Sequence, residues 1–122
     1  LLSRRQQVAD WYKVRLEKIP GVMTPTIAPS TTRMSWFVYV VRFEAEVERD
    51  RVAKALEERN IPTRPYFTPI HLQKYMKERF GYREGDYPVA EDLGRRGLAL
   101  PFSGVMTEEQ VELVCSNLRA VL

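Results

Sequence analysis

The sequence predicts an α+β fold in which a small, mostly antiparallel sheet packs against helices. Segments with helical periodicity alternate with short segments rich in aromatic and β-branched residues, and the first and last segments both carry a helix-initiation signature. We expect three strands and five helices. The length of 122 residues fits one folding unit, so we expect a single domain over residues 1–122.

The composition excludes several classes of protein. Hydrophobic residues make up 44% and charged residues 29%, which suits a packed core and not a disordered tail. The 19 basic and 16 acidic residues are mixed along the chain, which argues against nucleic acid or a membrane as partner. The single cysteine, Cys115, and the single histidine, His71, form no set of metal ligands. The chain begins with Leu1 rather than Met, so we expect a processed protein or a piece of a longer one.

The first helix is predicted from residue 3 to residue 19. Ser3 and Gln6 have the spacing of a capping box. Apolar side chains then recur at three- and four-residue steps, and Pro20 ends the pattern. The members of this stripe are Val8, Trp11, Tyr12, Leu16 and Ile19. Residues 22–33 hold prolines, serines and threonines without a helical period, so we expect an extended surface loop.

The strongest strand pattern runs from residue 36 to residue 43. This segment is dense in aromatic and β-branched residues, which suit a pleated and mostly covered surface. Trp36, Phe37 and Tyr39 could stack bases, as in RNA-binding sheets, but the glycine-interleaved basic and aromatic run of that class is missing. We therefore expect these three side chains to pack in the core.

A helix and an edge strand are predicted next. Asp50 is expected to cap the helix, and Asn60 is expected to end it in the left-handed conformation. A short strand follows at residues 63–67. Because Pro65 cannot donate to a ladder of hydrogen bonds, we expect this strand at the edge of the sheet.

Two short helices, a strand and a final helix are predicted in the remainder. The first helix covers residues 72–80 and ends at Gly81, and the second covers residues 88–93, with Asp86 as its N-cap and Glu91 as a first-turn charge. The strand covers residues 98–102. Thr107 and Gln110 then form a second capping box. We interpret the cysteine of the final helix as a core filler. The apolar stripe of this helix consists of Val111, Val114, Cys115, Leu118 and Leu122.

Residues 61–75 are the richest candidate for a binding site. Three prolines stiffen this stretch, so Arg64, Tyr66 and His71 stand on a backbone with little freedom. Arg64 can bind a phosphate or a carboxylate, Tyr66 offers a hydroxyl group and a flat ring, and His71 offers a donor or an acceptor. The alternative is structural: His71 caps the next helix and Tyr66 packs in the core. On the residues alone, the structural alternative is favoured.

Several ordered motifs resemble the C-terminal domain of DegT/DnrJ/StrS-type sugar aminotransferases. They are Asn60 through Tyr66, Pro69 through Gln73, Pro88 through Glu91, Leu98 through Pro101 and Thr107 through Val111. The resemblance implies the small C-terminal domain of a fold-type-I enzyme, with residues 1–21 as the helix that joins it to a larger domain. The full-length enzyme of this family uses pyridoxal phosphate (PLP) to move an amino group, usually from glutamate, onto the keto group of a nucleotide-linked sugar. It is expected to be a cytoplasmic, bacterial homodimer.

The same resemblance sets expectations for individual residues. It implies a substrate-binding role for Arg64, Tyr66, Phe67, His71 and Trp36. The lysine that forms the Schiff base and the other cofactor-binding residues are expected in the large domain, so we expect no catalytic, cofactor-binding or metal-binding residue here, and no activity from the 122 residues alone. The alternative hypothesis is a stand-alone α+β module that binds RNA or protein and has no enzyme activity.

Overall fold

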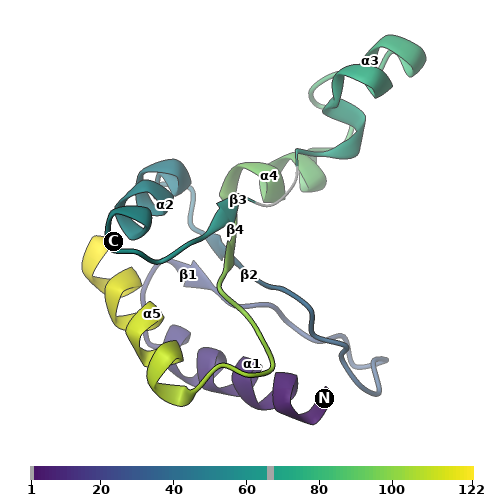
Figure 1. Cartoon of the computed structure of the whole chain (residues 1–122). Helices are drawn as coiled ribbons and strands as arrows, with labels where there is room; N and C mark the ends of the chain where they lie inside the picture. Colours follow the sequence, from purple (N-terminus) through teal and green to yellow (C-terminus); the bar gives the residue numbers. More distant parts are fainter. Residues whose placement is uncertain (1, 66–67) are drawn as a thin grey trace.

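The computed structural model describes residues 2–65 and 68–122 and has the expected α+β fold (Figure 1). Its centre is a four-stranded antiparallel sheet in the order β1-β2-β4-β3. The strands are β1 (Val22–Met23), β2 (Tyr39–Phe43), β3 (Arg64–Pro65) and β4 (Gly97–Leu100). In the register, Val41 of β2 pairs with Leu98 of β4. As predicted, the strand that contains Pro65 lies at the edge of the sheet. The missing N–H of the proline therefore interrupts no hydrogen bonds between the inner strands.

Three helices cover one face of this sheet. α1 (Leu2–Leu16) and α5 (Glu108–Val121) lie side by side, and α2 (Arg49–Glu58) packs beside α5 (Figure 1). Alternate residues of β2 point into this layer, where Tyr39 stacks on Tyr12 with ring centroids 5.0 Å apart. The Tyr12 hydroxyl donates a hydrogen bond to the carbonyl oxygen of Pro101. Cys115 is buried in the same core, as predicted for a filler.

Two short helical segments between residues 70 and 80 lie away from the body of the fold. We call residues 68–87 the arm; it contains a 3-10 turn, η1 (Ile70–Leu72), and the short helix α3 (Lys74–Phe80). α4 (Pro88–Arg96) follows the arm and leads into β4. α3 has no buried residue and stands apart from the sheet (Figure 1). The arm therefore contributes little to the core.

The predicted helix ends are partly confirmed. The Thr107 hydroxyl oxygen accepts from the backbone N–H of Gln110, and the Gln110 side chain accepts from that of Thr107, so α5 has its capping box. Asn60 adopts a φ of 63° after α2, and the N–H of Ile61 returns to the carbonyl of Leu56 over 2.9 Å. These are the features of a Schellman motif.

Three predicted caps are wrong. Glu48, not Asp50, is the N-cap of α2, because the helix begins two residues earlier than expected. Tyr87, not Asp86, precedes α4, and the Asp86 carboxylate instead accepts from the N–H of Arg83. The side chain of Gln6 makes no reciprocal cap with Ser3, because it donates to Asp10 and accepts from Trp36.

Other expectations also need correction. Residues 22–23 form β1 within the expected loop, which makes four strands among the described residues rather than three. β2 begins at Tyr39, so Trp36 precedes the strand, and Phe37 is 70% exposed rather than in the core. α3 begins at Lys74 rather than at Leu72, because η1 occupies the three positions before Gln73, the N-cap of α3. Leu122 lies beyond α5 and is exposed, and Val121 fills the apolar stripe in its place.

Candidate functional site

The sheet face opposite the helical layer carries two arginines. Ala99 of β4 pairs with Val40 on one side and with Arg64 on the other, while Leu98 and Leu100 point into the core. Directly paired residues of antiparallel strands share a face. Val40, Ala99 and Arg64 therefore form a row on the face turned away from the helices.

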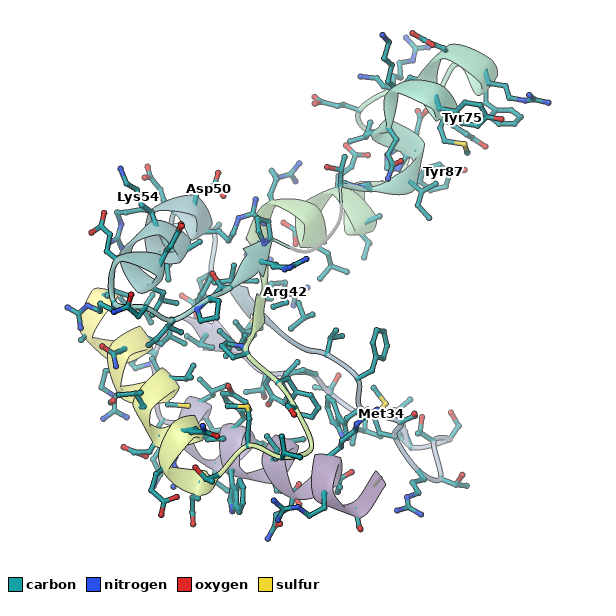
Figure 2. The ribbon with its side chains drawn as sticks, in the orientation of Figure 1. Met34, Arg42, Asp50, Lys54, Tyr75 and Tyr87 are labelled. Atoms are coloured by element: carbon teal, nitrogen blue, oxygen red, sulfur yellow. The ribbon has the colours of Figure 1, made fainter. Side chains whose placement is uncertain are left out.

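Arg42 lies on this same face. It is half-buried, pairs with Met23 and Gly97, and its guanidinium donates to the sulfur of Met23 over 3.6 Å. Figure 2 shows Arg42 near the junction of α4 and β4. Arg64 is exposed. Two guanidinium groups on one face can bind phosphate or carboxylate groups through charge-assisted hydrogen bonds.

A buried hydrogen-bonded pair of side chains holds the base of the arm. His71 Nε2 and Glu91 Oε2 are 3.0 Å apart, and each side chain is 6% exposed. The Glu91 carboxylate also accepts from the backbone N–H groups of Gly85 and Tyr87. Hydrogen bonds hold the pKa of Glu91 below its ordinary value. The largest contribution comes from the Gly85 N–H, and smaller ones come from the Tyr87 N–H and His71, while desolvation acts in the opposite direction. Glu91 is therefore a carboxylate at neutral pH.

A largely apolar cavity of about 540 Å³ adjoins this pair. Its lining includes His71, Met76, Tyr82, Leu93 and Gly94. Tyr87 also lines the cavity, and its ring meets the His71 ring edge-on at 4.8 Å (Figure 2 shows Tyr87 on the arm). A cavity with apolar walls and a few polar groups is typical of a small-molecule binding site.

The structure describes three of the five predicted binding residues and places them in different surroundings. Arg64 is exposed at the sheet edge, and His71 is buried against Glu91 rather than capping a helix. Trp36 is 5% exposed, donates to Gln6 and stacks near Tyr39, so it lies in the core on the side of α1. Tyr66 and Phe67 lie outside the described residues. His71 and Trp36 are thus not brought together.

Two residues of the site escaped sequence analysis. Arg42 is a charged residue inside an otherwise apolar strand, and this break in the apolar pattern could have marked it as a candidate site residue. Glu91 was explained as a helix-dipole charge, and its real partners come from residues 71, 85 and 87. No local spacing rule pairs a histidine with a glutamate 20 positions later.

The surroundings of the lysines show whether this chain could hold PLP by itself. A Schiff-base lysine is activated by a desolvated pocket or by a neighbouring cation. All lysines of the chain are instead exposed, and two of them lie beside glutamates on helix surfaces. They are Lys13, Lys18, Lys54, Lys74 and Lys77. The described residues therefore do not fit a PLP site.

Comparison with solved structures defines the class of the protein. S. venezuelae DesV, solved in complex with a ketimine intermediate, matches with a TM-score of 0.86 and 30% identity over 98% of this chain and 31% of that one. The aminotransferase TlmJ from Streptoalloteichus hindustanus matches with a TM-score of 0.84 and 29% identity over 98% of this chain and 31% of that one. The fold is that of fold-type-I aminotransferases.

Sequence comparison then identifies the family. Residues 1–119 match the DegT/DnrJ/EryC1/StrS aminotransferase family, and the chain belongs to it. The spore coat polysaccharide biosynthesis protein SpsC of Bacillus subtilis (strain 168) is 33% identical over 98% of this chain and 32% of its own length. The chain thus spans about a third of the relatives that it matches. Among the described residues, no helix is long and apolar enough to cross a membrane.

Proposed function

We propose that this chain is the C-terminal small domain of a PLP-dependent aminotransferase that transfers an amino group from glutamate to a nucleotide-linked keto-sugar in the cytoplasm. The match of residues 1–119 to the family, over only a third of its relatives' length, carries this proposal. One relative, 31% identical over 96% of this chain and 30% of its own length, is the GDP-perosamine synthase of Escherichia coli O157:H7.

The chain's role in that enzyme is to bind and orient the substrate. Arg64, exposed at the sheet edge, supplies a forked donor for the diphosphate of the nucleotide sugar, and Arg42 adds positive charge on the same face. Phosphate and sugar hydroxyls would contact Arg64, His71 and the neighbouring Tyr66 and Phe67. Trp36 supports this wall from within the core. Such positioning lowers the entropic part of the barrier without any proton transfer by these residues.

The reactive lysine must then come from the large domain of the complete enzyme. PLP, when bound there, supplies the electron sink that transamination needs. The complete enzyme is proposed to be a homodimer, and the 122 residues alone are proposed to be inactive.

The experiment is an assay of the complete, PLP-loaded enzyme that contains this chain. With L-glutamate and a panel of nucleotide-linked keto-sugars, we expect an aminated sugar nucleotide by mass spectrometry and 2-oxoglutarate in equal amount. The 122-residue chain with added PLP is the control and should form neither product. Amination of 2-oxo acids in place of sugar nucleotides, or of no sugar nucleotide in the panel, would overturn the proposal.

A further inference from the structure

The Glu91 carboxylate fixes the protonation pattern of the His71 ring. Gly85 donates its N–H to both carboxylate oxygens, at 2.9 and 3.1 Å, and Tyr87 donates its N–H to Oε2 at 3.0 Å. Glu91 is therefore an acceptor on both oxygens. Since His71 Nε2 lies 3.0 Å from Oε2, a hydrogen bond between them requires the proton to be on Nε2.

This assignment leaves a single ring nitrogen for a ligand. In the neutral ring with a proton on Nε2, Nδ1 is an acceptor. His71 is one of the residues that line the cavity at the base of the arm. Tyr82 and Tyr87 meet the His71 ring edge-on, at 6.3 and 4.8 Å, and limit its rotation. A hydrogen bond from the neutral ring to a molecule in the cavity would therefore use Nδ1.

The position of Glu91 is itself fixed from two sides. Its backbone belongs to α4, and its carboxylate is tied to the loop before α4 through Gly85 and Tyr87. The far end of α4 is held by Arg49, which donates to the carbonyl oxygens of Gly94 and Gly97 at 2.9 Å each. A chain of direct contacts thus connects the His71 ring to the first residue of β4.

We propose that Glu91 is a positioning residue that holds His71 in the Nε2–H tautomer, so that Nδ1 accepts a hydrogen bond from a hydroxyl group of the nucleotide-linked sugar. Glu91 itself does not touch the ligand. This inference rests on the proposed function for the identity of the ligand, whereas the tautomer can be measured without it.

The first measurement is ¹⁵N NMR of the histidine ring in the 122-residue chain. His71 is the only histidine in the sequence, so its signals need no assignment. At about pH 8 we expect an unprotonated Nδ1 and an Nε2 proton protected from solvent exchange. Glu91→Gln should remove this protection, because one amide oxygen cannot accept from three donors. The exposed neighbour Glu84→Gln is the control and should retain it. A protonated Nδ1, or equal protection in Glu91→Gln, would overturn the inference.

The second measurement compares two replacements of His71 in the complete enzyme. Asn places its amide oxygen near the position of Nδ1, whereas Gln places its polar group near Nε2. His71→Asn should keep the Michaelis constant for the sugar nucleotide within about threefold of wild type, and His71→Gln should raise it about tenfold, as expected for one lost hydrogen bond. The KM for glutamate should be unchanged in both, as should the cofactor absorbance.

The outcomes separate this inference from the proposed function. If the wild-type enzyme aminates no sugar nucleotide, the proposed function fails, and with it the ligand assigned to Nδ1, while the NMR result still decides the role of Glu91. If the wild type is active and His71→Gln binds the sugar nucleotide as well as or better than His71→Asn, the role of Nδ1 is overturned. A purely structural role of the pair would lower the melting temperature of both variants equally without this difference in KM.

Discussion

The guanidinium group of Arg49 donates a hydrogen bond to the carbonyl oxygen of Gly97 over 2.9 Å, linking the first residue of α2 to the first residue of β4. The same Nη1 atom donates to Gly94 in the last turn of α4. The side chain of Arg49 is only 13% exposed. Arg49 thereby fixes the helix that carries Glu91 against the body of the fold.

Arg49→Ala should destabilise the chain by about 2 to 3 kcal/mol, because it leaves two carbonyl oxygens of the α4–β4 junction without their charged donor. Urea unfolding measured by tryptophan fluorescence gives this value. Arg59→Ala is the control: Arg59 is exposed and donates to Asn117, so its loss should cost less than about 1 kcal/mol. Equal effects of the two substitutions would show that the contacts of Arg49 contribute nothing beyond an exposed hydrogen bond.

Alkaline conditions should destabilise the fold through Cys115. Burial raises the pKa of this thiol from 9.0 to about 12. Above pH 9 the unfolded chain therefore loses a proton that the folded chain keeps, and the free energy of unfolding falls as the pH rises toward 12. The slope can reach about 1.4 kcal/mol per pH unit.

Cys115→Ala removes this titration. The variant should be less stable at pH 7 but should lose less stability between about pH 8.5 and 9.5, a range in which Tyr12 and Tyr39 contribute less than the thiol because their unfolded-state pKa of 10.0 lies above it. Chemical denaturation at three pH values measures the slope. Parallel pH profiles for wild type and variant would contradict the role of the buried thiol.

The exposed apolar residues on the arm and α4 should make the 122-residue chain self-associate. Ile70 is 70% exposed, Tyr75 64% and Val89 72%, on segments that pack little against the core (Figure 2 shows Tyr75 at the outer end). Such clusters of apolar surface mark interaction sites. Sedimentation velocity should show concentration-dependent dimers or larger species.

The double substitution Ile70→Ser and Val89→Ser should reduce this association. Val105→Ser is the matched control, since Val105 is 82% exposed but lies outside the arm and α4. A wild-type chain that stays monomeric at high concentration and binds no hydrophobic dye would contradict the prediction.

The elements that sequence analysis predicted well are those set by local chemistry. The capping box at Thr107 and the left-handed Asn60 depend on residues within a few positions of each other, and both are present. The buried stripe of α1 includes Val8, Tyr12 and Leu16, as its spacing required. Pro65 lies in an edge strand for the equally local reason that it lacks an N–H.

The features that escaped prediction depend on contacts between distant segments. β1 has two residues and exists only because it pairs with β2, and nothing in its own sequence indicates a strand. Glu91 is buried because residues 71, 85 and 87 converge on it. Of the residues in the candidate site, sequence analysis therefore singled out Arg64 and His71 but missed Arg42 and Glu91, and the binding roles of Arg64 and His71 stay predictions.

The proposal that this chain forms the sugar-nucleotide wall of an aminotransferase is tested most sharply by the kinetics of Arg64→Ala in the complete enzyme. We expect the KM for the sugar nucleotide to rise about tenfold or more, since a charge-assisted contact contributes about 1.5 to 3 kcal/mol, while the KM for glutamate and the cofactor spectrum stay at wild-type values. Arg33→Ala, an exposed arginine in the loop before β2, is the control and should change neither KM. A KM for the sugar nucleotide that is unchanged in Arg64→Ala, or a rise in the KM for glutamate alone, would contradict the proposal.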